Sequence, residues 1–301
     1  MRGHSATSRI TTLWHEARPL DRITWTYILA FAVGLAVLGR EHSSWGALFL
    51  IHVVLLAAIA LILTHWNDRT DGIAGFIRLT YPAILYTFFY TELGTAIHWV
   101  FPGFMDHQVI ALERALFGVD LNVWIRPFQV PLINEWMMLG YGTYYVLIPI
   151  LALTLFFQRR PAELQSFLTA TTTTFVMSYV VFVLYPVEGP RYFLADRLGL
   201  PIEGYVFVPL VQSIIERGAI HGGCMPSTHS AIALIVLIWA YRSVRRLGVI
   251  LTPFVITLFL GTVWGHFHYA IDVVVGLLLA LVGLYLADRM SPGRELSGSA
   301  T

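Results

Sequence analysis

The chain has 301 residues, of which 57% are hydrophobic and 12% are charged, and its mean hydropathy is +0.69. These values exclude a soluble domain of this length and predict an integral membrane protein. The formal net charge of +1 argues against a nucleic-acid partner, and the single cysteine, Cys224, excludes an internal disulfide and a CxxC metal or redox motif.

Polar and apolar segments alternate along the chain. Residues 1–22 are polar and rich in arginine and show no small-residue cleavage site, so they are expected to form a cytoplasmic tail. Apolar runs of roughly spanning length then recur at 23–38, 45–64, 77–100, 136–157, 167–185, 228–241, 249–264 and 269–286. The pattern predicts an all-α, polytopic membrane helix bundle of about eight transmembrane helices.

Composition and motifs divide the rest of the chain into three parts. Residues 23–165 are expected to form the N-terminal transmembrane helices. They include a mixed polar and apolar segment at 102–131, which is typical of an interfacial or re-entrant helix. Residues 166–290 contain the motifs described below and are expected to be the catalytic core, and residues 291–301 are expected to be a second cytoplasmic tail.

The distribution of arginine indicates how the chain crosses the membrane. If the eight apolar runs alternate in direction, one side collects the N-terminal arginines, Arg69, the pair at 159–160 and the cluster at 242–246. The arginines of the other side are diluted by acidic residues. The positive-inside rule therefore predicts that both termini are cytoplasmic and that the segments before 228 and around 266–268 face outward, in a bacterial cell membrane.

A loop with the sequence GCMPSTHS, at 223–230, leads into one of the apolar runs. Pro226 suits the first turn of a helix, and Ser227 or Thr228 can cap it. The free backbone N–H groups of a helix start and the positive end of its dipole favour an anion such as phosphate. His229 then lies in the first turn, beside that anion site.

His268 and Asp272 lie four residues apart at the start of the last apolar run. On a helix they share one face, so the carboxylate can accept a hydrogen bond from one imidazole nitrogen and leave the other free as a nucleophile or base. The alternative is that Asp272 caps the last helix and His268 is a hydrated interfacial residue.

Arg191 lies in the sequence YPVEGPRY, which ends the fifth apolar run. Its planar guanidinium can bind two phosphate oxygens at once, and the flanking prolines stiffen the turn. The alternative for a lone arginine is that it snorkels to the lipid head groups.

Taken in order, Pro190-Arg191, the PSTH motif at 226–229 and His268-x-x-x-Asp272 resemble the motifs of the type 2 phosphatidic acid phosphatase superfamily, which are K-x6-R-P, P-S-G-H and S-R-x5-H-x3-D. The resemblance covers roughly the last half of the chain. It implies a membrane enzyme that cleaves or transfers a lipid phosphoester on the non-cytoplasmic face. The implied substrate is a membrane lipid phosphate or phospholipid, and in the transfer case a second lipid is the acceptor.

The same resemblance assigns roles within the site. His268 is the implied nucleophile, which forms a phosphohistidine, and Asp272 orients it. His229 is the implied general acid, which protonates the leaving oxygen and later acts as a base. Arg191, Ser227 and Thr228 are implied to hold the phosphate oxygens, and no metal or other cofactor is implied.

The chain departs from the superfamily pattern at several cationic positions. Leu184 occupies the position of the first lysine, Tyr192 follows Arg191 in place of proline, Gly261 and Thr262 replace S-R, and Thr228 replaces glycine. The reduced set of cations resembles the branch of inositol phosphorylceramide synthases and sphingomyelin synthases, which transfer a phospho-head group between lipids. Residues 113–120 and 141–145 also resemble bacterial proteins of that branch.

The sequence leaves open the roles of two further polar residues and allows two other classes of function. Glu92 and His266 either line a substrate cavity or form an interhelical pair and an interfacial residue, respectively. Histidine and carboxylate also suit zinc, which allows a metal site built from His221, His229, His266, His268 and Asp272. A transporter or scaffold is the third class, and the absence of repeats weakens it.

Overall fold

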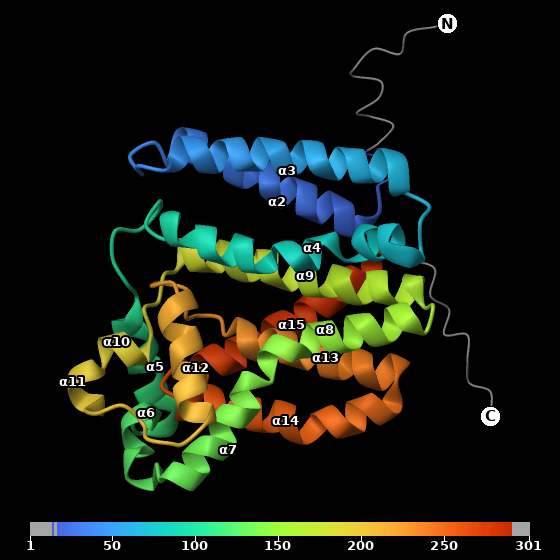
Figure 1. The fold of residues 1–301 in the computed structure, drawn as a ribbon. Coiled ribbons are helices and arrows are strands. Elements are labelled where there is room, and N and C mark those ends of the chain that lie inside the picture. Colours follow the sequence, from blue (N-terminus) through green and yellow to red (C-terminus); the bar gives the residue numbers. More distant parts are fainter. Residues whose placement is uncertain (1–13, 15–16, 291–301) are drawn as a thin grey trace, which may run out of the picture.

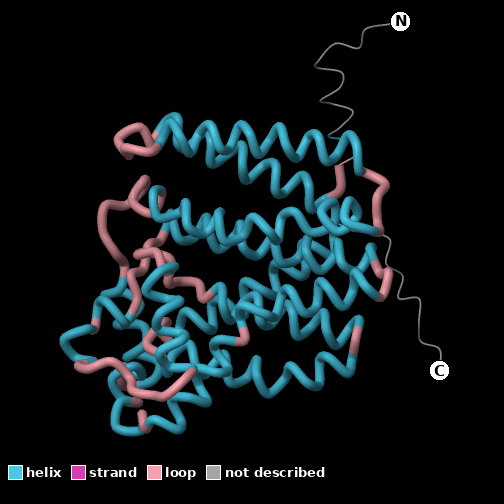
Figure 2. The backbone as a smooth tube through the Cα atoms, viewed as in Figure 1, coloured by secondary structure: helices cyan, strands magenta, loops and turns pink. Residues whose placement is uncertain are grey.

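The computed structural model describes residue 14 and residues 17–290, which form a helical bundle (Figures 1 and 2). Within these residues there is no strand, and one isolated parallel bridge pairs Val187 with Gly223. The predicted all-α fold is therefore confirmed.

Six long helices run along the bundle and are long and apolar enough to cross a membrane. They are α2 (Pro19–Val37), α3 (Trp45–Trp66), α4 (Gly72–Glu92), α9 (Pro161–Leu184), α14 (Arg245–Trp264) and α15 (Ala270–Met290). A seventh candidate is the pair α7 (Pro131–Gly142) and α8 (Tyr144–Phe157), which is bent by 40°. With α13 (Thr228–Ser243), a helix of 16 residues, the chain runs along the bundle eight times (Figure 1). The count of eight transmembrane helices stays a prediction.

The shorter elements gather at one end of the bundle, where most of the long loops also lie (Figures 1 and 2). They are η1 (Leu93–Thr95), α5 (Asp106–Phe117), α6 (Leu121–Trp124), η2 (Arg126–Phe128), α10 (Pro190–Phe193), α11 (Ala195–Leu198) and α12 (Phe207–Gly218). The segment at 102–131 is therefore largely helical, and its position at the membrane surface stays a prediction. Helices α10 to α12 fill a stretch for which the sequence predicted only a loop.

The centre of the bundle is formed by α9 and α13. A run of threonines on α9 is buried because each hydroxyl donates to a backbone carbonyl four residues earlier: Thr171 to Phe167, Thr172 to Leu168, Thr173 to Thr169 and Thr174 to Ala170, at 2.7–2.9 Å. These bonds leave no hydroxyl unsatisfied in an apolar interior. Helix α3, by contrast, lies at the edge and exposes Leu50, Val54 and Leu61, as expected for a surface that faces lipid.

A buried ion pair joins α2 and α4 at the end of the bundle opposite the short helices. Arg78 donates to both carboxylate oxygens of Asp21, at 2.9 and 2.8 Å, and also to Asn67 at 2.9 Å. Tyr81 donates to the same carboxylate at 2.8 Å. These bonds satisfy both terminal nitrogens of Arg78 and both oxygens of Asp21, while Arg78 Nε is buried without a partner among the described residues. The pair joins the starts of the two helices.

Candidate active site

Backbone hydrogen bonds bring the three motifs together at the end of the bundle that holds the short helices. Val187 N donates to Gly222 O at 3.2 Å and Cys224 N to Val187 O at 3.1 Å, which places the Arg191 loop beside the PSTH loop. Ser227 N donates to Asp272 O at 2.9 Å, which joins that loop to the start of α15. Segments more than 80 residues apart in the sequence are thus adjacent at one end of the bundle, and their joint role as a catalytic site stays a prediction.

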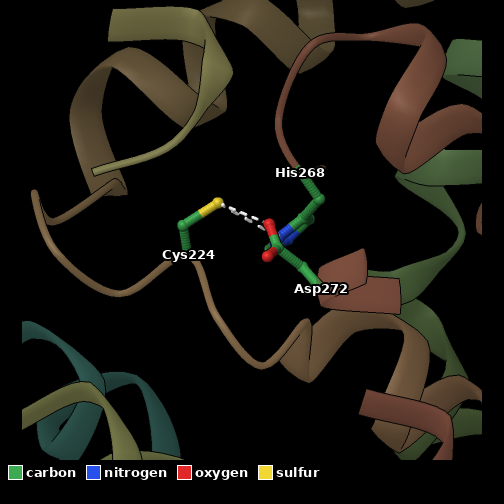
Figure 3. Close-up of side chains that lie close together, drawn as sticks. All are labelled: Cys224, His268 and Asp272. Atoms are coloured by element: carbon green, nitrogen blue, oxygen red, sulfur yellow. Dashed lines mark hydrogen bonds and ion pairs between the residues drawn. The ribbon is translucent and has the colours of Figure 1, made fainter. Parts of the chain in front are cut away.

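His268 and Asp272 form the buried part of the site. Asp272 lies in the first turn of α15 and is 0% exposed, while His268 lies in the preceding turn and is 4% exposed. Asp272 Oδ2 lies 3.6 Å from His268 Nδ1 and accepts hydrogen bonds from Tyr269 N at 2.8 Å and Cys224 Sγ at 3.0 Å (Figure 3). At this distance the two groups are in contact but not hydrogen-bonded, and a small movement would shorten the contact to a hydrogen bond.

Cys224 is the third side chain of this cluster and lies against both His268 and Asp272 (Figure 3). Its sulfur lies 3.5 Å from His268 Nδ1 and 3.3 Å from Phe267 O. Burial raises the pKa of the Cys224 thiol well above its usual value, and the charge of Asp272 raises it further. The group is therefore a neutral thiol that donates its proton to the carboxylate.

His229 faces His268 from the first turn of α13. The distance from His229 Nδ1 to His268 Nε2 is 3.4 Å, and His229 Nε2 lies 3.0 Å from the hydroxyl of Tyr141 on α7. The rings of Tyr141 and Tyr144 pack on the imidazole, with centroid distances of 4.9 and 4.2 Å. Tyr141 of α7 and Tyr144 of α8 therefore hold the plane of the His229 ring between them.

The polar neighbours of the two histidines bear on where each ring carries its protons. Asp272 lies 3.6 Å from Nδ1 of His268, so a proton on that nitrogen faces the carboxylate and Nε2 is left to present a lone pair. The Tyr141 hydroxyl can donate to an unprotonated Nε2 of His229 or accept from a protonated one. The two rings face each other through Nε2 of His268 and Nδ1 of His229.

Ser227 and Thr228 form the start of α13, as predicted. The Ser227 side chain caps the helix by accepting from Ser230 N at 3.3 Å, and its hydroxyl also lies 3.2 Å from Ser230 Oγ. Both Ser227 and Thr228 are buried. The cap leaves the free N–H groups of the first turn, rather than the serine hydroxyl, as the groups best able to meet an anion.

Arg191 lies on α10 and lines a cavity of about 210 Å³. Its Nη2 is 3.6 Å from Glu216 Oε1 on α12, and its Nη1 is buried with no hydrogen-bond partner in the described part of the chain. A buried guanidinium N–H without a partner is costly, so an anion at this position is strongly favoured.

His266 lines the same cavity as Arg191, and its place in a substrate cavity stays a prediction. Its Nδ1 lies 3.1 Å from Asn122 Oδ1 and its Nε2 3.0 Å from the side-chain amide of Gln129. Burial, assisted by the charge of Arg126, lowers the pKa of His266 to about 4. The ring is therefore neutral at neutral pH and adds no cation to the site.

Glu92 lies in a different place. It accepts from Tyr27 on α2 at 3.0 Å and contacts His52 Nε2 on α3 at 3.2 Å. These contacts match the interhelical pair, which was one of its two predicted roles. They connect the first three helices to one another, and Glu92 is not among the residues that line the Arg191 cavity.

Two acidic residues of α5 hold the site together and were not predicted from the sequence. Asp106 accepts from Glu188 N at 2.8 Å, from Gly189 N at 2.9 Å and from the Tyr269 hydroxyl at 2.9 Å. Glu113 accepts from Ala270 N, at the start of α15, at 2.8 Å. Burial raises the pKa of Glu113 to about 7. The sequence did contain a signal for them, because these two acidic residues lie in a segment whose apolar residues have helical spacing.

The five-residue zinc site considered above is not assembled. His221 is instead exposed and paired with Glu188 at 2.9 Å, and His266 is held by Asn122 and Gln129. The metal-capable donors that do converge are those of Cys224, His268 and Asp272, whose ligand atoms all lie within 4.8 Å of one another.

Two facing histidines and a buried carboxylate thus meet at one end of the helix bundle, and Arg191 lines a cavity that also contains His266 and Phe267, close to His268 in the sequence. The model of the PAP2 superfamily matches residues 107–286, which is more than half of the chain. The chain therefore belongs to the PAP2 superfamily, the family that its motifs resemble.

Two curated relatives match parts of the chain. A PA-phosphatase related-family protein of Dictyostelium discoideum is 23% identical over 134 residues, which cover 43% of this chain and 24% of the relative. The phosphoinositol dihydroceramide synthase of Bacteroides thetaiotaomicron is 27% identical over 196 residues, which cover 57% of this chain and 63% of the relative. The match thus spans about a quarter of the first relative and less than two thirds of the second. No solved structure matches the chain.

Proposed function

We propose that the protein cleaves a lipid phosphoester at the non-cytoplasmic face of the membrane, through a phosphohistidine formed on His268. The observation that carries this proposal is the approach of His268 Nε2 to His229 Nδ1, at 3.4 Å, with Asp272 behind the first ring and Tyr141 behind the second. Arg191 supplies the cation for the phosphate oxygens.

In the first step, the Nε2 lone pair of His268 attacks phosphorus. The N–P bond forms and the bond from phosphorus to the leaving oxygen breaks. His229 enters this step as an imidazolium whose Nε2–H donates to the Tyr141 oxygen, passes its Nδ1 proton to the leaving oxygen and becomes neutral. Asp272 stabilises the positive charge that develops on the His268 ring. The phosphoryl group has to enter between the two nitrogens, so their separation increases when substrate binds.

Arg191 and the first turn of α13 provide the electrostatic part of the reaction. The negative charge on the non-bridging oxygens grows as the N–P bond forms, and fixed N–H donors stabilise that charge without reorganising. In the second step, His229 takes a proton from water or from an acceptor hydroxyl, whose oxygen attacks phosphorus and releases His268.

Hydrolysis and transfer share every step before the second attack. Transfer of a phospho-head group to a second lipid is the alternative function. Two observations support it: the relative named phosphoinositol dihydroceramide synthase, and the reduced set of cations, with Leu184 in place of the first lysine. The site lies at the end of the bundle, where a lipid in the outer leaflet can reach it.

Turnover of labelled lipids by the purified full-length protein tests the proposal. The panel contains a phosphatidic acid, several phosphodiester lipids and, in parallel samples, a ceramide or diacylglycerol acceptor. We expect one of these lipids to be cleaved, and His268→Ala or His229→Ala to lower turnover by at least about 10³-fold, since each removes a catalytic group. His221→Ala, an exposed histidine of the same outer region, serves as the control.

Trapping of the intermediate tests the assigned nucleophile. Radiolabelled phosphate should be recovered on His268 as an acid-labile, base-stable adduct, and His268→Ala should abolish it. Turnover that survives His268→Ala would refute the role of this residue, and no turnover of any lipid would refute the enzymatic proposal.

A further inference from the structure

Cys224 is a buried side chain that the proposed reaction does not need. It lies two residues before the PSTH motif and places its sulfur beside His268 and Asp272 (Figure 3). The distances are 3.0 Å from Sγ to Asp272 Oδ2, 3.5 Å from Sγ to His268 Nδ1, and 3.6 Å from His268 Nδ1 to Asp272 Oδ2. Three different donor types therefore meet in a triangle.

The size of this triangle fits a tetrahedral zinc ion. Zn–S bonds of about 2.3 Å and Zn–N and Zn–O bonds of about 2.0–2.2 Å, at tetrahedral angles, place the ligand atoms about 3.3–3.6 Å apart. Two of the three observed distances lie within this range, and the third, 3.0 Å from Sγ to Asp272 Oδ2, is about 0.3 Å below its lower limit. A small outward movement of the thiol brings all three donors to bonding geometry.

The carboxylate has an unsatisfied atom that independently points to a ligand. Asp272 is 0% exposed, and its second oxygen, Oδ1, is buried with no hydrogen-bond partner among residues 14 and 17–290. A buried carboxylate oxygen without a partner is unfavourable, and a cation relieves this cost. Tyr269 N, which donates to Oδ2 at 2.8 Å, orients the carboxylate from outside the triangle.

We propose that Cys224, His268 and Asp272 form a binding site for zinc, and that zinc bound there inhibits the enzyme. The metal binding stands on the geometry alone, whereas the inhibition rests on the function proposed above. Zinc acts here as an inhibitor and not as a cofactor. It binds Nδ1 of His268, the nitrogen that has to face Asp272 for Nε2 to attack phosphorus.

The balance of charge and protons explains the inhibition. Zinc displaces the thiol proton, which leaves the site, and the Zn²⁺, the thiolate and the carboxylate sum to zero charge, as a buried site requires. Zinc takes the lone pair of His268 Nδ1, so the imidazole proton moves to Nε2. The nitrogen that attacks phosphorus then has no lone pair, and the imidazole is held in the wrong tautomer.

Cobalt binding tests the site without any measurement of turnover. The chain contains one cysteine, so a thiolate-to-cobalt charge-transfer band can arise only from Cys224. We expect this band when Co²⁺ is added to the purified full-length protein, its loss when Zn²⁺ is added in competition, and its absence in Cys224→Ser and Cys224→Ala. Absence of the band in the wild-type protein at saturating Co²⁺ would overturn the site.

Zinc inhibition tests the consequence. We expect micromolar Zn²⁺ to inhibit lipid turnover, EDTA to restore it, and Cys224→Ser to raise the half-inhibitory concentration at least about tenfold, each variant being compared with its own metal-free rate. His221→Ala, which removes an exposed histidine, should leave zinc inhibition unchanged. Equal inhibition of wild type and Cys224→Ser would overturn the proposed inhibition. A protein that turns over no lipid but shows the cobalt band would refute the proposed function and leave the metal site standing.

Discussion

At the scale of single residues, each of the two histidines has a polar neighbour that bears on its protonation. Asp272 lies 3.6 Å from His268 Nδ1 within the same motif, and this proximity was predictable from a spacing of four residues. The Tyr141 hydroxyl lies 3.0 Å from His229 Nε2, although Tyr141 is on α7, 88 residues earlier in the chain. In the sequence Tyr141 is one aromatic residue among many in an apolar run, and only the packing of the α7–α8 segment against α13 makes it a partner of His229.

Replacement of Tyr141 tests its support of His229 as the proton donor. Tyr141→Phe keeps the ring that packs on His229 and removes the hydroxyl that lies 3.0 Å from Nε2. The imidazolium of His229 then loses the acceptor of its Nε2 proton, so we expect kcat to fall about tenfold, with KM nearly unchanged, for the loss of one hydrogen bond of about 1–1.5 kcal/mol. Steady-state kinetics with the lipid identified above measure the effect.

Tyr145→Phe is the matched control, because Tyr145 lies on the adjoining helix and is 40% exposed. Its kinetics should match those of the wild-type protein. If Tyr141→Phe retains the full kcat, the hydroxyl does not support His229 as the proton donor.

At the scale of helices, α15 approaches the PSTH loop more closely than side chains normally permit. Gly276 lies on the face of α15 that meets Ser227, and a Cβ at this position would come within 2.4 Å of Ser227 O. The glycine therefore allows the backbone of the second motif to rest against the helix that carries Asp272.

Gly276→Ala should move the second motif away from α15, because the atom it meets belongs to the backbone and cannot rotate aside. We expect turnover to fall at least about tenfold and the thermal midpoint to drop, as for an overpacked core position costing about 1–3 kcal/mol. Gly46→Ala is the control. A Cβ there meets nothing within 4 Å, and the substitution should be neutral or stabilising. Wild-type turnover in Gly276→Ala would show that the two segments can separate without loss of the site.

Helix α5 connects to α15 through Glu113, and this contact has a predictable pH dependence. Burial raises the pKa of Glu113 from its usual 4.5 to about 7. Between these values the folded protein holds a proton that the unfolded chain has released, so the free energy of unfolding falls as the pH rises from 4.5 toward 7. Above pH 7, the folded protein contains a buried carboxylate.

Glu113→Gln should remove this dependence while keeping an oxygen that accepts from Ala270 N. We expect the variant to be more stable than the wild type at pH 8, by up to about 3 kcal/mol, and to resemble it near pH 4.5. Thermal midpoints measured in detergent from pH 4.5 to 8 test this, with Glu203→Gln, an exposed carboxylate, as the control. Parallel curves for the Glu113→Gln and wild-type proteins would contradict a raised pKa at this position.

At the scale of the whole molecule, the length of the apolar runs predicted the long helices well. A bilayer crossing requires about 20 consecutive apolar residues, and runs of this length mark the long helices. It predicted α13 only as a short run, since this helix is buried among α9, α14 and α15 and need not face lipid along its length. Helices α10 to α12 were missed because their polar residues and prolines resemble a loop. In α12 the spacing of Val208, Val211 and Ile215 was the available signal for an amphipathic helix.

The orientation of the bundle in the membrane is the remaining prediction about the whole molecule. The end that carries the site also carries the α2–α3 connection at 38–44, and the opposite end carries the α3–α4 connection at 67–71 (Figure 1). The arginines at 69, 159–160 and 245–246 lie at this opposite end, which the positive-inside rule places in the cytoplasm.

Cysteine labelling can test this orientation, because Cys224→Ser removes the one native thiol. In that background we expect a membrane-impermeant maleimide to label Ser43→Cys in intact cells, since Ser43 is exposed on the α2–α3 connection. Asp68→Cys, exposed on the α3–α4 connection, should react only after the membrane is made permeable. The reverse pattern would place His229 and His268 at the cytoplasmic face, and the lipid substrate would then have to come from the inner leaflet.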